Sequence, residues 1–145
     1  MDTTIVEKYD KSRYNMLIGA TVGWGVWFGL NIILPYVHNK PVKLIIVAIG
    51  LMGIVLAVVS YFRMVGIKKV IKKHPELGLM LNNEWVIHTK RQAIAIGYWS
   101  MLMIAAIGIG ITSFIVVSGF LLMQIVLFTG IQSMLIAHLV LLRGK

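Results

Sequence analysis

Four long apolar runs without a charged residue constrain the fold of this chain most strongly. They contain no Asp, Glu, Lys or Arg and cover about residues 14–37, 44–62, 93–117 and 121–142. A helix needs about 20 apolar residues to cross the roughly 30 Å hydrocarbon core of a bilayer. Barrel strands would instead alternate apolar and polar residues over about 10 positions. The sequence therefore predicts an all-α membrane protein, a bundle of four transmembrane helices made of two helical hairpins.

The composition supports one transmembrane domain over residues 1–145. The chain is 59% hydrophobic and only 13% charged, whereas soluble domains carry about 25% charged residues. It contains no cysteine, which excludes disulfides and thiol catalysis. A net charge of +9 can indicate nucleic acid or anionic lipid as partner. In a chain this apolar it favours lipid headgroups, and we expect no nucleic-acid partner.

The distribution of basic residues predicts the orientation. With four spans, the N-terminus, the long polar segment 63–92 and the C-terminus share one side of the membrane. That side holds twelve of the fourteen basic residues: Lys8, Lys11, Arg13, Arg63, Lys68, Lys69, Lys72, Lys73, Lys90, Arg91, Arg143 and Lys145. The other side holds Lys40 and Lys43 in a short turn, and a tighter turn at 118–120. The positive-inside rule then places both termini and segment 63–92 in the cytoplasm, in a bacterial inner membrane.

Segment 63–92 has an internal order of its own. Its first part, "FRMVGIKKVIKK", is expected to continue the second helix beyond the membrane until Pro75 ends it. The stretch "PELGLMLNN" predicts a short apolar turn or helix against the end of the bundle. Asn82 or Asn83 is a suitable N-cap for the third helix, with Glu84 in its first turn. The second and third helices should therefore both extend into the cytoplasm.

Two functions are open for the cationic residues of this segment. Those of interest are Lys68, Lys69, Lys72, Lys73, Lys90 and Arg91. They could bind anionic membrane lipids or a cytoplasmic protein partner, with lysine stems lying along the interface. The alternative is that they only set the topology of the chain.

Small residues at three- and four-residue spacing predict close helix packing. They include two G-x-x-x-G pairs in the first span and a stripe in the second: Gly19, Gly23, Gly25, Gly29, Gly50, Gly53 and Ala57. Such residues let helix backbones approach one another in lipid. The contacts could lie within the bundle, or they could form the seam of a homodimer.

Polar and aromatic residues in the first and fourth spans are candidates for a ligand pocket. They are Trp24, Trp27, Asn31, Gln124, Gln132 and His138. Gln124 and Gln132 lie eight residues apart on one face of a helix, and amides in hydrocarbon need hydrogen-bond partners. That face should point into the bundle, either for interhelical hydrogen bonds or as a small pocket for an amphipathic ligand.

Reactive groups do not gather in any pattern that indicates catalysis. We find no nucleophile with a nearby base and no phosphate-binding loop, so we expect no catalytic residues, no enzyme activity and no cofactor. His74, His88 and His138 lack the spacing of a helical metal site, and we expect no metal. Ion-coupled transport generally uses an ionisable residue within the membrane, and only His138 approaches that position.

These observations favour a non-enzymatic accessory, regulatory or immunity-type membrane protein. It would act through helix packing and its basic cytoplasmic loop. The alternative is a small transporter or binder of an amphipathic molecule, with a pocket between the first and fourth spans.

The middle segment also resembles a group of bacterial four-span membrane proteins of unknown function. The residues that support the resemblance are Pro75, Glu76, Leu77, Asn82, Asn83, Glu84, Lys90 and Arg91. The group often has Asp before Glu, where this chain has Asn83. The resemblance covers about 25 residues; it implies the four-span architecture and no activity.

Overall fold

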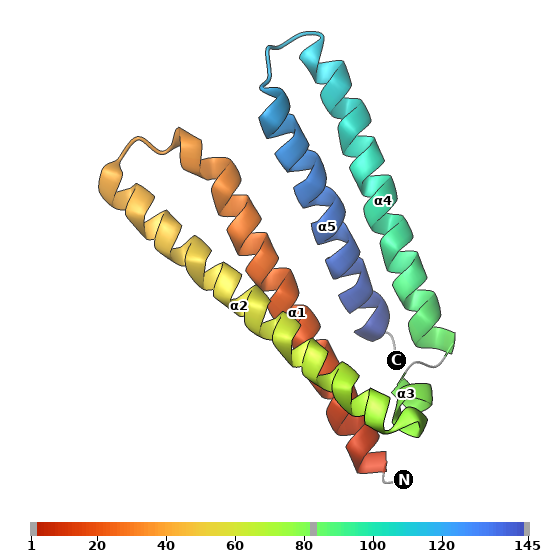
Figure 1. Ribbon diagram of the computed structural model, residues 1–145. Coiled ribbons are helices and arrows are strands. Elements are labelled where there is room, and N and C mark those ends of the chain that lie inside the picture. Colours follow the sequence, from red (N-terminus) through yellow and green to blue (C-terminus); the bar gives the residue numbers. More distant parts are fainter. Residues whose placement is uncertain (1–2, 82–83, 144–145) are drawn as a thin grey trace.

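The computed structural model describes residues 3–81 and 84–143, which fold into helices and short connections without any strand (Figure 1). The long helices are α1 (Thr3–Ile33), α2 (Lys40–Lys73), α4 (Glu84–Thr112) and α5 (Gly119–Arg143). Two short elements join them, the 3₁₀ helix η1 (Leu34–Tyr36) and helix α3 (Pro75–Leu81). The predicted all-α fold is confirmed for this part of the chain. By length and composition, α1, α2, α4 and α5 are each suited to cross a membrane.

The long helices form two antiparallel hairpins. α1 packs along α2, α4 packs along α5, and the main contact between the hairpins is that of α1 with α5. In Figure 1 the hairpins lie close together near α3 and diverge toward their turns. We call the end that holds α3, the start of α1 and the end of α5 the basic end. The opposite end, with residues 37–39 and 113–118, is the turn end.

The bounds of α2 follow from its sequence. Asn39 caps its N-terminus, with the side-chain oxygen accepting a hydrogen bond from the backbone N–H of Val42 at 3.5 Å, and Pro41 lies in its first turn. The helix continues past the apolar run to Lys73, and Pro75 begins α3 directly after His74. Proline is favoured in the first turn of a helix and disfavours helical geometry in the residue before it. The predicted continuation of the second helix past its apolar run and its end before Pro75 are confirmed.

The segment after α3 agrees with prediction where the structure describes it. α3 is a helix, α4 begins at Glu84, and the negative charge of Glu84 lies in the first turn of α4. The third helix therefore begins nine residues before the apolar run at 93–117, as the extension predicted. The predicted N-cap at Asn82 or Asn83 lies outside the described residues.

One boundary differs from prediction and another was not predicted. α1 begins at Thr3, so the polar residues before the apolar run are helical as well; extending an existing helix costs far less than nucleating a new one. The predicted turn at 118–120 is wrong, because α4 ends at Thr112 and the connection is 113–118. The hydroxyl of Thr112 donates to the carbonyl of Ile109 at 2.7 Å, and such side chains compete with the helical backbone bonds.

The most buried apolar side chains gather near the basic end. They come from α1, α2, α3 and α4, and each is 8% exposed or less: Met16, Ile67, Leu81, Val86 and Ala93. Leu81, at the end of α3, is only 2% exposed. The short helix therefore closes the basic end of the bundle with an apolar side chain.

Glycines set the closest approach within each hairpin. A Cβ atom at Gly23 of α1 would lie 2.6 Å from the carbonyl oxygen of Gly53 on α2. In the second hairpin, a Cβ at Gly97 of α4 would lie 2.7 Å from the carbonyl oxygen of Gly130 on α5. Because real side chains do not approach so closely, both helix pairs require glycine at these points.

Candidate functional site

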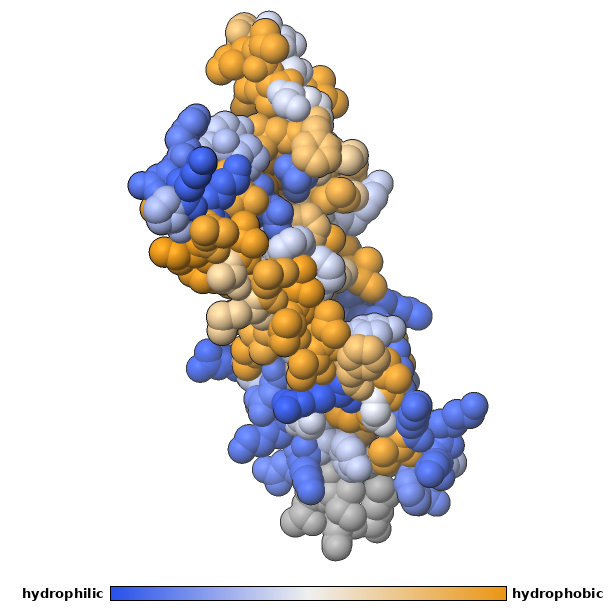
Figure 2. All heavy atoms as spheres, turned by 60° about the vertical axis from the view of Figure 1, so that its left-hand side comes forward, coloured by the Kyte–Doolittle hydropathy of each residue, from blue (hydrophilic) through white to orange (hydrophobic). Residues whose placement is uncertain are grey.

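The basic end presents the predicted cationic residues on its surface. Figure 2 shows hydrophilic side chains around the lower end of the molecule and a broad hydrophobic band above them. All six of the following are exposed: Lys68, Lys69, Lys72, Lys73, Lys90 and Arg91. Ile67 on the same part of α2 is buried, at 8% exposure. The four lysines of α2 therefore lie on its outer side, and Ile67 between them faces inward.

Arg13 of α1 ties α3 to the bundle. Its Nη1 atom donates a hydrogen bond to the backbone carbonyl of Leu81 at 2.6 Å. That carbonyl belongs to the last turn of α3, where a cation interacts favourably with unpaired carbonyls and with the helix dipole. From the sequence, Arg13 was interpreted only as one of the charges that set the topology. Its structural role depends on a partner 68 residues away, which no local pattern indicates.

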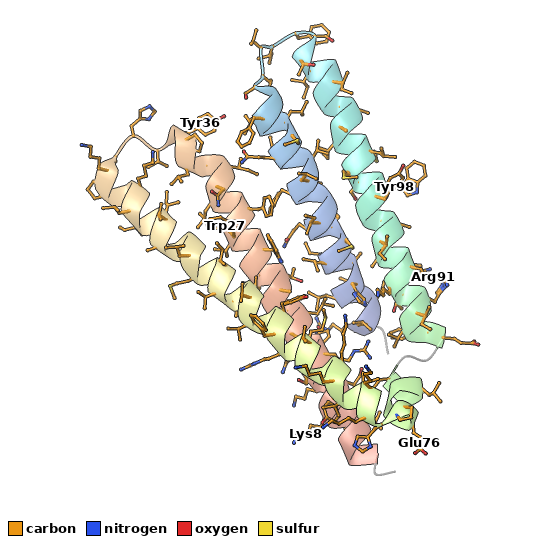
Figure 3. All side chains as sticks on the ribbon, viewed as in Figure 1. Lys8, Trp27, Tyr36, Glu76, Arg91 and Tyr98 are labelled. Carbon is orange, nitrogen blue, oxygen red and sulfur yellow. The ribbon has the colours of Figure 1, made fainter. Side chains whose placement is uncertain are left out.

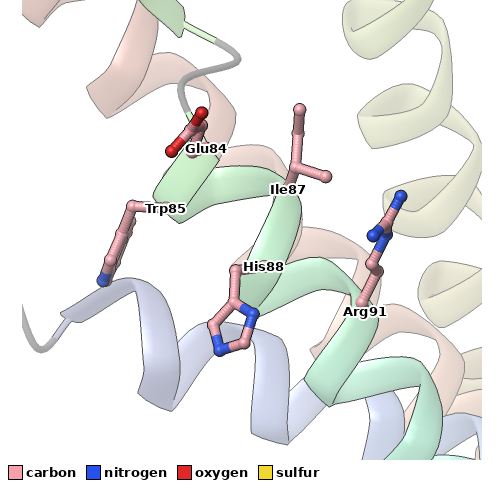
Figure 4. Close-up of a pocket in the computed structure, with 5 residues that line it drawn as sticks. All are labelled: Glu84, Trp85, Ile87, His88 and Arg91. Carbon is pink, nitrogen blue, oxygen red and sulfur yellow. The ribbon is translucent and has the colours of Figure 1, made fainter.

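The first turns of α4 form an open surface hollow of about 540 Å³. Five residues of this one helix line it: Glu84, Trp85, Ile87, His88 and Arg91. In Figure 4, Trp85 and His88 point to one side of the helix while Ile87 and Arg91 point to the other. The hollow is therefore a wide helix surface rather than an enclosed site. An aromatic ring beside basic residues is typical of the membrane–water interface.

His138 lies inside the basic end and shows no ligand geometry. Its Nε2 atom is buried and has no hydrogen-bond partner among the described residues. Arg13 on α1 and Lys90 on α4 are the positive charges nearest to its ring. Within residues 3–81 and 84–143, no group of three or more His, Cys, Asp or Glu is arranged to hold a metal ion.

The polar face of α5 points toward α1, as its spacing predicted. The Nε2 atom of Gln132 donates to the backbone carbonyl of Thr21 at 3.1 Å. One turn away, the ring of Phe128 lies 6.3 Å from that of Phe28. Gln124 on the same face is half-buried. This is the interhelical hydrogen bonding that the sequence left open, and it joins the two hairpins.

The remaining pocket candidates do not join Gln132 in one cavity. The side-chain amide of Asn31 donates to the carbonyl of Trp27 on its own helix at 2.8 Å. The ring of Trp27 lies against α2, where a Cβ at Gly50 would be 3.4 Å from it. Figure 3 labels Trp27 on α1. Trp27 thus packs within the α1–α2 hairpin rather than in a space between α1 and α5.

Trp24 and Trp27 line an apolar groove between α1 and α2, with a volume of about 330 Å³. Small residues of both helices lie at its floor and larger side chains in its walls: Gly23, Trp24, Trp27, Ile54, Ala57, Val58 and Tyr61. We call it the α1–α2 groove. Its glycine, alanine and tryptophan residues were identified from the sequence, whereas Ile54, Val58 and Tyr61 were missed. An apolar side chain within a long apolar run gives no signal that distinguishes a groove from plain lipid contact.

Most of the predicted packing residues lie inside the α1–α2 hairpin. Gly19 meets the side chain of Ser60, and Gly23 and Gly53 meet each other's backbone. Gly25 instead faces the amide of Gln132 on α5, and Gly29 has nothing within 4 Å. Except for Gly29, these glycines therefore make contacts within the bundle, which is the first of the two predicted alternatives. Gly97 and Gly130, which pack α4 on α5, were missed: Gly130 has no small residue four positions away in the sequence, and Gly97 has only Ala93.

Comparison with known proteins gives no relative for this chain. No family model matches it, and neither a curated protein nor a solved structure shows significant similarity to it. The resemblance of segment 75–91 to four-span membrane proteins stays a prediction.

Proposed function

We propose that this chain is a non-enzymatic protein of the bacterial inner membrane, with four spans and both termini in the cytoplasm. In this proposal it is an accessory, regulatory or immunity-type component that holds anionic lipids around its basic end. The observation that supports it best is the exposure of six cationic side chains at one end of an apolar four-helix bundle. Each Lys or Arg near an anionic membrane surface contributes roughly 1 kcal/mol to binding.

Neutralising the lysines of α2 tests the lipid-binding part of the proposal. Replacing Lys68, Lys69, Lys72 and Lys73 by glutamine is expected to reduce the anionic lipid that co-purifies in mild detergent at least about tenfold. The measurement is mass spectrometry of the retained lipids, as the ratio of phosphatidylglycerol to phosphatidylethanolamine. The matched control replaces Lys40 and Lys43 at the turn end, and it should keep the wild-type ratio. An unchanged ratio in the four-lysine variant would leave these lysines as topology signals only.

Labelling of intact cells tests the proposed orientation. A membrane-impermeant amine reagent is expected to modify Lys40 and spare Lys72, because the turn end faces outward in this proposal. Permeabilised cells serve as the control, in which both lysines should react. Labelling of Lys72 with protection of Lys40 in intact cells would invert the topology and refute the cytoplasmic assignment.

A further inference from the structure

We infer that the α1–α2 groove seats one acyl chain of an anionic phospholipid whose phosphate is held at Lys68. The inference rests on the proposed function and adds to it one defined lipid position. Three features support it: the shape of the groove, its depth in the bundle and the charge that lies below it on the same helix face.

The groove owes its shape to the glycine contact between the helices. Gly23 and Ala57 lie at the floor, where a Cβ at Gly23 would be 3.0 Å from the Cβ of Ala57. The larger side chains stand at both sides and leave the mouth open, since Trp24 is 41% exposed and Val58 is 44% exposed. The bundle therefore has a built hollow on its outer surface, bounded by tryptophan rings.

The groove lies at the depth of the hydrocarbon. Trp24 follows Arg13 by eleven residues, which is roughly 16 Å along a helix. The volume of the groove, about 330 Å³, is at the small end of the range for ligand pockets. A partner helix is about 10 Å across with its side chains and does not enter a hollow of this size, whereas a single acyl chain does.

A continuous face of α2 leads from the groove to a lysine. Ile54, Val58, Tyr61, Val65 and Lys68 follow one another at steps of four and three residues, so they share one face of the helix. Tyr61 is 59% exposed and marks the end of the groove nearer the basic end. Lys68 lies seven residues beyond it, roughly 10 Å along the axis, and is exposed. An apolar tail in the groove would thus place an anionic headgroup within reach of this ammonium group.

The groove offers an optical readout, because two of the four tryptophans of the chain are in its wall. Replacing Trp85 and Trp99 by phenylalanine leaves Trp24 and Trp27 as the emitters. This background protein is reconstituted into phosphatidylcholine vesicles that contain a rising fraction of phosphatidylglycerol with brominated acyl chains. Brominated phosphatidylcholine in the same vesicles is the reference. Half-maximal quenching is expected at an about fivefold lower fraction of the anionic lipid, the ratio that corresponds to roughly 1 kcal/mol from one lysine.

Two variants separate a seated chain from general lipid contact. Val58→Phe fills the groove from its exposed wall. Its quenching curve with brominated phosphatidylglycerol should therefore move to the position of the curve with brominated phosphatidylcholine. Lys68→Gln leaves the groove intact and should remove the about fivefold preference. The control Val55→Phe is on the same helix at a position that is 61% exposed and does not line the groove, so it should leave both curves unchanged.

The outcomes distinguish this inference from the proposed function. If Val58→Phe leaves the anionic curve unchanged while the four-lysine variant still loses co-purified anionic lipid, the groove inference is overturned and the proposed function stands. The alternative result is that the two brominated lipids quench the tryptophan fluorescence of the background protein at the same lipid fraction. In that case the groove contacts only the general lipid shell or is covered by a protein partner, and the inference is again overturned. If the four-lysine variant also loses no lipid, both fail.

Discussion

Replacing Gly23 by valine is expected to lower the free energy of unfolding by about 3 kcal/mol, the upper part of the usual range for overpacking. The Cβ atom would lie 2.6 Å from the carbonyl oxygen of Gly53 and 2.8 Å from the backbone nitrogen of Ala57. Backbone atoms cannot rotate away as a side chain does, so α1 and α2 would have to separate along their contact. The measurement is reversible unfolding in mixed micelles, titrated with sodium dodecyl sulfate and followed by tryptophan fluorescence.

The same substitution at Gly29 is the matched control. Gly29 is on α1 as well, but an added Cβ there meets nothing within 4 Å. Gly29→Val should therefore unfold at or slightly above the wild-type midpoint, since any side chain reduces the flexibility that glycine gives the unfolded chain. Equal midpoints for the two valine variants would show that α1 and α2 are not in backbone contact at Gly23.

Truncating Leu81 to alanine is expected to cost about 3 kcal/mol of stability, within the range for a buried leucine. Leu81 is 2% exposed and its backbone carbonyl accepts the Arg13 hydrogen bond. At the basic end the surroundings are charged and aqueous in the proposed orientation, so burial of this side chain is driven by the hydrophobic effect rather than by packing in lipid alone. Unfolding in mixed micelles gives the stability, and hydrogen exchange of the α3 amides should accelerate in the variant.

Leu79 supplies the comparison for that experiment. It lies on the same short helix but is 78% exposed, and exposed substitutions usually change stability by less than about 0.5 kcal/mol. Leu79→Ala should therefore match wild type in both measurements. If Leu81→Ala and Leu79→Ala behave alike, α3 does not close the basic end in solution.

The architecture was predictable because it depends on properties that are local in the sequence. The length and apolarity of the four runs indicate the helices, and Pro75 marks the end of α2. The turn after α4 was misplaced because Thr112 and Ser113 are compatible with an apolar helix, and the apolar run continues without a break beyond the end of α4 at Thr112. The start of α1 was not predicted, because polar residues can continue a helix as readily as end it.

The candidate site was less predictable because it depends on which helices become neighbours. Gln132 and Trp27 were both identified as unusual, yet one contacts α1 and the other contacts α2. Spacing along a helix shows which residues share a face, but it does not show which helix that face will meet. Arg13 and Leu81 illustrate the same limit, since their hydrogen bond joins residues 68 positions apart.

The absence of charge from residues 113–118 bears on how the chain enters the membrane. In the proposed orientation, translocation of the α4–α5 hairpin moves no formal charge outward, because neither this connection nor the adjoining turns of α4 and α5 contain Asp, Glu, Lys or Arg. The α1–α2 hairpin must instead export Lys40 and Lys43, and each elementary charge moved against the potential costs about 2.3 kcal/mol per 100 mV. A larger membrane potential should thus oppose insertion of the α1–α2 hairpin, and it should not affect insertion of the α4–α5 hairpin.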